Sequence, residues 1–137
     1  MVKKISPLAP KSFPKIPNIK GVEIGTARSG VKYKGRNDIF TAIFDKGTSV
    51  AGVFTQSRVP AEPVTFCKKN IVDGKARALI VNAGFANAYT GAKGKKINKS
   101  ISSNVKKILK CNEKDIFICS TGVIREQIPL RPTNKSI

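Results

Sequence analysis

The sequence of 137 residues predicts an α/β fold, an α+β sandwich in which a mixed sheet packs against helices. Short runs rich in β-branched and aromatic residues, bounded by turn residues, predict the strands. One longer segment repeats its apolar residues at helical spacing, which is typical of a helix lying on a sheet. Because 40% of the residues are hydrophobic, the chain can bury a core of its own, and its length suits one domain.

The N-terminal residues 1–20 are expected to form an extended arm, because they contain four prolines. Proline lacks a backbone N–H and fixes φ, which disfavours a helix or a central strand. Residues 21–137 are then expected to form the domain. Its first part, 21–35, predicts a twisted pair of strands with turns at residues 29–30 and 34–35.

Four apolar runs predict the other strands. Residues 38–44 and 49–55 flank an Asp-Lys-Gly turn at 45–47, so we expect them to pair as a tight hairpin. Residues 76–84 and 115–120 are more continuously apolar, which predicts two buried strands.

Two segments predict helices. A short helix is expected to begin near Pro63, because proline is favoured at the first helical position. Residues 95–110 predict a longer amphipathic helix, with an apolar stripe on one side and lysines on the opposite arc. The expected inward residues are Val64, Cys67 and Ile71 in the first helix, and Ile97, Ile101, Val105 and Ile108 in the second. The lysines of the outer arc are Lys96, Lys99, Lys106, Lys107 and Lys110.

The composition excludes several kinds of catalytic site. There is no histidine, so Ser-His-Asp triads, Cys-His dyads and histidine-ligated metals cannot be built from these residues. Cys67, Cys111 and Cys119 lack metal-binding spacing and are expected to be reduced core residues, with no metal bound. No apolar run is long enough to span a membrane, and we expect a cytoplasmic protein.

The net charge of +18 leaves two interpretations open. A strongly basic chain can bind the phosphate backbone of nucleic acids. The basic residues, however, are mostly lysines spread along the chain and seldom beside aromatic residues, whereas base readers and stacking platforms favour arginine and exposed aromatics. This pattern favours a solvated, lysine-rich surface over a nucleic-acid site.

Two motifs suggest chemistry. In "VNAGFANAYTG" (81–91) a buried strand opens into Asn82, Gly84 and Asn87, which predicts either a structured loop alone or a loop that supports a neighbouring site. In "FICSTGVIRE" (117–126) a strand ends in Ser-Thr-Gly. The Thr121 hydroxyl and the Gly122 N–H could donate to one point, as an oxyanion hole requires, although such a sequence is also common in turns. Neither is expected to be a nucleophile, since the chain offers no base to activate it.

Three segments in order resemble the N-terminal, α-chain part of the glutamate N-acetyltransferase/ornithine acetyltransferase family of arginine biosynthesis. They are "GVFTQSRVPAEPV" (52–64), "ALIVNAGFANAYTG" (78–91) and "CSTGVIREQIP" (119–129). The resemblance assigns the oxyanion hole to Thr121 and Gly122 and support roles to the asparagine-glycine loop. The chain departs from the family pattern at Phe85, where an asparagine is expected, and at Arg125, where a glycine is expected.

The resemblance also implies the fold and the reaction. In this family a precursor cleaves itself before a threonine, and the new N-terminal threonine of the β chain accepts the acetyl group, with its α-amine as base. The acetyl group moves from N-acetylornithine to glutamate, some members also use acetyl-CoA, and no cofactor is implied. The nucleophile is absent from these 137 residues, so the chain is expected to be inactive without a β portion, with which it would form an (αβ)2 assembly. The rival interpretations are a basic nucleic-acid-binding protein and part of a related self-processing aminopeptidase.

Overall fold

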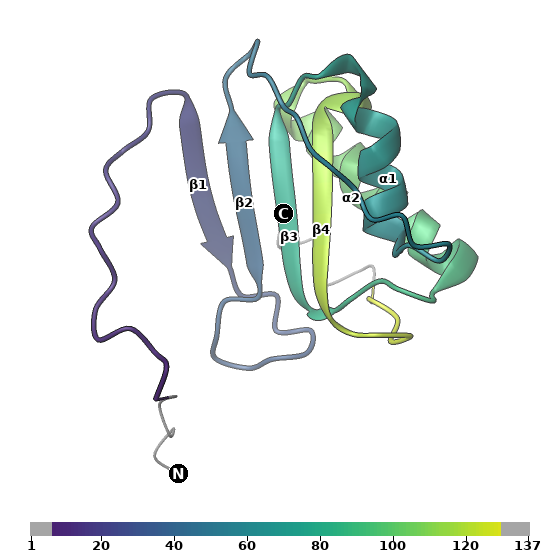
Figure 1. The fold of residues 1–137 in the computed structure, drawn as a ribbon, viewed down its shortest axis with the longest axis horizontal. Coiled ribbons are helices and arrows are strands. Elements are labelled where there is room, and N and C mark those ends of the chain that lie inside the picture. The colour runs from purple at the N-terminus through teal and green to yellow at the C-terminus, as the bar shows by residue number, and fades with distance from the viewer. Residues whose placement is uncertain (1–6, 130–137) are drawn as a thin grey trace.

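The fold of the computed structural model, which describes residues 7–129, is a four-stranded mixed sheet with two helices (Figure 1). The sheet order is β1-β2-β3-β4; β1, β2 and β3 pair antiparallel, while β3 and β4 pair parallel. The predicted α/β class and mixed sheet are confirmed. The elements are β1 Val22–Ala27, β2 Ile39–Phe44, α1 Glu62–Asn70, η1 Ile71–Asp73, β3 Ala78–Phe85, α2 Gly91–Leu109, η2 Glu113–Asp115 and β4 Ile116–Val123. Residues 7–20 contain no helix or strand, and the remaining terminal residues, 1–6 and 130–137, lie outside the described part.

The first hairpin differs from the prediction of a strand pair within residues 21–35. Only Val22–Ala27 of that range forms a strand, and it pairs with β2. Residues 28–38 connect the two strands, and Asp38 holds this connection by accepting hydrogen bonds from the Ser29 amide and hydroxyl, both at 2.6 Å. The predicted local strand pair therefore does not form. Hydrogen bonds to the buried Asp38 carboxylate hold the connecting segment instead.

The predicted hairpin between 38–44 and 49–55 is wrong in its second strand. The turn forms, with the Thr48 amide donating to the Asp45 carbonyl at 3.3 Å, but the following residues make only one isolated bridge, between Ser49 and Lys75. Both edges of β2 are already paired, to β1 and β3, so no edge remains for a further strand.

Helix α2 covers one face of the sheet. It buries Ile97, Ile101 and Val105 as predicted, but Ile108 is 63% exposed, because Leu109 packs against the core in its place. The helix begins at Gly91, four residues before the expected start. Its predicted outer lysines are all exposed. Within residues 7–129 no helix is long and apolar enough to cross a membrane.

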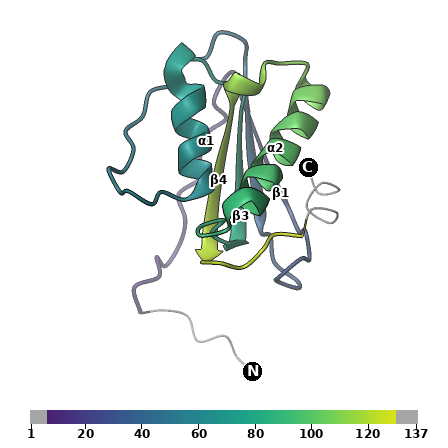
Figure 2. The ribbon, with the colours of Figure 1, turned by 90° about the vertical axis from the view of Figure 1, so that its right-hand side faces the viewer.

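Helix α1 runs along the outer edge of β4 (Figures 1 and 2). It begins at Pro63 within one residue, as predicted, and Cys67 is buried. The Cys67 thiol donates to the Ile118 carbonyl at 3.2 Å and accepts from the Ile118 amide at 3.4 Å, while Asn70 Nδ2 donates to the Ile116 carbonyl at 2.8 Å. Burial raises the pKa of Cys67 and keeps it a thiol. These contacts satisfy three backbone groups on the unpaired edge of β4, namely the Ile116 carbonyl and the amide and carbonyl of Ile118.

The face of the sheet opposite α2 is apolar and only partly covered. Side chains alternate between faces along a strand, so the residues on this face follow from the register. We call it the open sheet face, made of Ile24, Phe40, Phe44, Leu79, Val81 and Phe117. Packing from Val50, Phe54 and Phe66 covers the part near Phe117, whereas Ile24 on β1 is 61% exposed.

Candidate active site

The two motifs singled out in the sequence meet at one end of the sheet. Because β3 and β4 are parallel, their carboxyl ends lie at the same edge. The register places Ala83 beside Thr121 and Gly84 beside Gly122. Strand β4 extends through this motif to Val123, so the Thr-Gly pair belongs to the strand and does not follow it.

The contact between the two strands depends on glycine. A Cβ added to Gly122 would lie 2.2 Å from the carbonyl carbon of Gly84 and 2.5 Å from the Phe85 amide nitrogen. Both glycines have positive φ, 137° at Gly122 and 113° at Gly84, which L side chains rarely adopt. The sequence therefore needs glycine at 122 both for its backbone conformation and for the approach of β3.

Asn82 links the motifs through its side chain. The Ser120 hydroxyl donates to Asn82 Oδ1 at 2.6 Å, and Asn82 Nδ2 donates to the Phe85 carbonyl at 2.9 Å. Asn82 is 8% exposed, so its side-chain amide makes its hydrogen bonds within the protein interior. The structure thus places the first predicted loop residue as a brace between the strand ends, pointing away from solvent.

Asn87 holds the loop that follows β3. It is fully buried with φ of 48°, and its amide donates to Asn98 Oδ1 at 3.0 Å and to the Gly94 carbonyl at 3.3 Å, while the Thr90 hydroxyl donates to its Oδ1 at 2.7 Å. Thr90 and Asn98 were not among the predicted residues. Asn98 could have been noticed, because it interrupts the apolar stripe of α2 with a polar side chain that must find partners.

The predicted donors lie at the exposed strand end. Thr121 and Gly122 are both exposed, and within residues 7–129 the Thr121 hydroxyl has no hydrogen-bond partner. Backbone hydrogen-bonding directions alternate along a strand. Ile118 directs its N–H away from β3 to Cys67, so Gly122, an even number of residues further on, is expected to direct its N–H to the same outer side.

The rim of this strand end contains a residue that the sequence reasoning missed. The Lys32 ammonium lies 5.1 Å from the Phe85 ring centre and forms an ion pair with Glu126. Arg125, at the position where the resemblance expects glycine, has φ of 69° and donates its amide to the Ala88 carbonyl at 2.9 Å. The positive φ gives a physical reason for a glycine preference there.

Within residues 7–129 no cysteine near this strand end has a lowered thiol pKa that would make it a strong nucleophile. Cys119 is exposed on the open sheet face, which corrects the expectation that all three cysteines are core residues, and partial desolvation raises the pKa of its thiol. Cys111 is partly buried. In the described part of the chain no group of three or more His, Cys, Asp or Glu side chains is placed to hold a metal.

Comparisons with known proteins agree on one family. The model of the ArgJ family matches residues 23–137. The arginine biosynthesis bifunctional protein ArgJ of Mesorhizobium japonicum is 51% identical over 124 residues, which are 90% of this chain and 30% of that protein. The ArgJ protein of Brucella suis is 49% identical over 128 residues, 93% of this chain and 31% of that protein. The chain therefore spans about 30% of the length of these relatives.

Two solved structures share the fold. The ArgJ protein of Bacillus halodurans superimposes with a TM-score of 0.79 at 32% identity, over 85% of this chain and 61% of that one. An ornithine acetyltransferase from Mycobacterium tuberculosis, crystallised with ornithine, gives a TM-score of 0.76 at 26% identity, over 85% of this chain and 64% of that one.

Proposed function

The chain belongs to the ArgJ family, and from this premise we propose that it is the N-terminal, α-chain portion of an acetyltransferase that moves an acetyl group from N-acetylornithine to glutamate. The observation that carries the proposal is the family match over residues 23–137, supported by the structural likeness to an ornithine acetyltransferase. Acetyl-CoA as a further acetyl donor and an (αβ)2 assembly are part of the same prediction.

Within this reaction we assign Thr121 and Gly122 to the oxyanion hole. The carbonyl of the acetyl donor becomes a negatively charged tetrahedral oxygen when a nucleophile adds to it, and hydrogen-bond donors fixed in advance stabilise that charge. The Thr121 hydroxyl, which has no hydrogen-bond partner within residues 7–129, and the adjacent Gly122 N–H, which is expected to point outward, would supply two such donors. Asn82, Gly84 and Asn87 would hold the strand ends in place, because their contacts are internal.

The nucleophile in this proposal comes from a β portion. The resemblance assigns that role to an N-terminal threonine, whose amine serves as base, so histidine is not required. We further propose that the β portion covers the open sheet face. Exposed apolar surface of this kind is typical of a protein interface. The chain covers 30% of the Mesorhizobium japonicum relative, so about 70% of that protein lies outside the matched region and could supply the covering portion.

The proposal is tested by reconstitution. The 137-residue chain would be produced alone and together with the complementary portion of the Mesorhizobium japonicum relative, and transfer of labelled acetyl from N-acetylornithine to glutamate would be measured. We expect no transfer by the isolated chain, which should also aggregate through the open sheet face, and transfer by the complex. Transfer by the isolated chain would contradict the two-part mechanism.

A pair of variants tests the assigned interface. Ile24→Lys places a charge on the open sheet face and should prevent complex formation, whereas Val72→Lys, at a residue of η1 that is 79% exposed and lies outside the sheet, should not. Equal complex formation by both variants would overturn the assignment of this face.

A further inference from the structure

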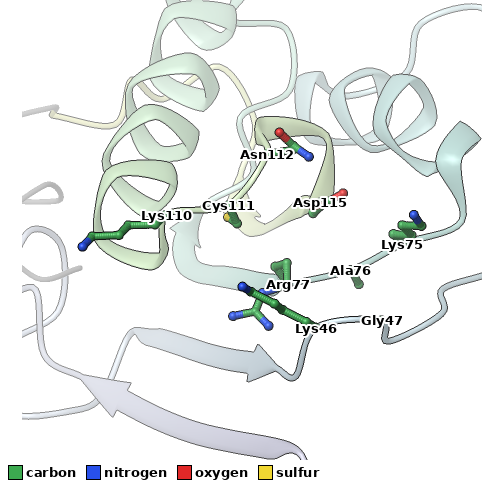
Figure 3. Close-up of a pocket in the computed structure, with 9 residues that line it drawn as sticks. All are labelled: Lys46, Gly47, Lys75, Ala76, Arg77, Lys110, Cys111, Asn112 and Asp115. Atoms are coloured by element: carbon green, nitrogen blue, oxygen red, sulfur yellow. The ribbon is translucent and has the colours of Figure 1, made fainter.

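A basic cavity lies at the other end of the sheet from the candidate active site (Figure 3). Its volume is about 340 Å³. Three segments build it: the turn after β2, the residues leading into β3, and the connection between α2 and β4. The lining residues are Lys46, Gly47, Lys75, Ala76, Arg77, Lys110, Cys111, Asn112 and Asp115.

The cations of this cavity have no carboxylate partners among the described residues. Four basic side chains line it, Lys46, Lys75, Arg77 and Lys110, against one carboxylate, Asp115. The ion pairs found within residues 7–129 all involve other lysines. The lining therefore has an excess of positive charge that nothing in the described chain neutralises.

Arg77 shows the lack of partners for these cations most clearly. Its Nε is buried and has no hydrogen-bond partner in the described residues. An unpaired buried donor loses its hydration without compensation, and the loss is larger for a charged group. Figure 3 shows the ends of Arg77 and Lys46 pointing to the same side of the cavity, where like charges repel unless an anion lies between them.

We propose that this cavity binds a small phosphorylated molecule through its phosphate groups. A guanidinium presents paired donors that match phosphate oxygens, and the Lys46 ammonium, whose end lies beside that of Arg77 in Figure 3, adds a point charge. The volume falls within the usual range of small-ligand pockets. No aromatic residue lines the cavity, so it offers phosphate contacts without a surface on which bases could stack.

The residues that line the cavity are also distinct from most of the surface lysines that give the chain its net positive charge. Of the predicted outer lysines of α2, Lys110 lines the cavity, whereas Lys99 and Lys107 do not. A nucleic acid attracted by net charge would use both groups of lysines, whereas a small phosphate ligand would depend on the lining alone. This difference makes the proposal testable with matched variants.

The test uses the full-length protein that the gene encodes. Pyrophosphate and inorganic phosphate are titrated into it at fixed ionic strength, and binding is measured by calorimetry. Arg77→Gln and Lys46→Gln should each weaken pyrophosphate binding by roughly tenfold to a hundredfold, the loss of one charge-assisted hydrogen bond. Lys107→Gln removes one charge of the same sign outside the cavity and should change the affinity by less than about twofold. Lys46 is exposed, so its variant should fold even where Arg77→Gln does not.

Three results would overturn the proposal. The first is the absence of pyrophosphate binding by the wild-type protein. The second is an equal loss of affinity in the Lys46→Gln and Lys107→Gln variants, which would mean general charge attraction. The third is a single-stranded oligonucleotide that binds more tightly than pyrophosphate and is weakened equally by both variants, which would make the basic surface a nucleic-acid site.

Discussion

Gly122→Ala should destabilise the protein far more than an ordinary glycine substitution. The backbone at Gly122 has φ of 137°, and a side chain in such a conformation costs about 1–3 kcal/mol. The added Cβ would also lie 2.2 Å from the Gly84 carbonyl carbon. The neighbouring atoms are backbone, which cannot rotate away, so overpacking adds about 1–3 kcal/mol. We expect a total loss of roughly 2–6 kcal/mol.

Two other glycines provide controls for this prediction. Gly30 has φ of 66° with nothing within 4 Å of an added Cβ, so Gly30→Ala should show only the backbone cost, about 1–2 kcal/mol. Gly84 would place its Cβ 3.1 Å from side-chain atoms of Lys32 and Tyr33, which can move. Gly84→Ala should therefore fall between the other two.

The assay is urea unfolding of the full-length protein, with the free energy of unfolding taken from the linear dependence on denaturant. The expected order of destabilisation is Gly30, then Gly84, then Gly122. A loss of at most 1–2 kcal/mol in Gly122→Ala, equal to that in Gly30→Ala, would mean that β3 and β4 do not approach each other as described.

Two further predictions concern buried polar groups. Asn87→Ala should lower the free energy of unfolding by roughly 2–4 kcal/mol, because it leaves buried partners such as Asn98 without their hydrogen bonds, whereas Tyr89→Ala, also at positive φ but exposed, should have little effect in the same urea titration. Burial alone would raise the pKa of Glu113, but hydrogen bonds from Lys99 and Ser102 lower it overall from 4.5. The unfolded chain therefore binds this proton more readily, and the stabilisation by Glu113, present above pH 4.5, should be lost as the pH falls through the lowered value. Glu113→Gln should reduce this acid-side slope in thermal melts across pH, and an unchanged slope would contradict the assignment.

The helices and strands predicted from local sequence pattern were confirmed where no other segment competes for the same pairing edge or packing surface. The long helix follows its apolar stripe through Ile97, Ile101 and Val105, because that stripe packs on the buried strand residues of the sheet. The strand at 38–44 and the buried strands around residues 76–84 and 115–120 are likewise close to their predicted bounds. Each has a strong apolar signal that one surface can bury.

The incorrect strand predictions have one cause: segments compete for the free edges of strands, and the local sequence pattern gives no information on which edges are free. Residues 49–55 have strand composition, but β2 has no free edge to offer them. The strand pair within 21–35 was replaced by long-range pairing of β1 with β2 and by the hydrogen bonds of Asp38. The role of α1 in covering the edge of β4 was also invisible in the sequence, because Cys67 and Asn70 act through backbone groups far along the chain.

The candidate site was predictable in part. The Asn-Gly and Thr-Gly motifs could be named from the sequence, and parallel strand pairing explains why they meet. The buried network of Asn87 with Thr90 and Asn98 and the ion pair of Lys32 with Glu126 join residues from separate segments. Such contacts depend on the tertiary arrangement, so the sequence pattern alone could not indicate them.

Turnover of a Thr121→Ala variant tests the oxyanion assignment most directly. The measurement is kcat and KM for acetyl transfer from N-acetylornithine to glutamate by the full-length protein, with Thr121→Ser as the matched control that retains the hydroxyl. The proposed role predicts that kcat falls by about 10²–10³-fold in Thr121→Ala, with little change in KM, and stays within about tenfold of wild type in Thr121→Ser. An unchanged kcat in a folded Thr121→Ala variant would contradict the role assigned to this strand end.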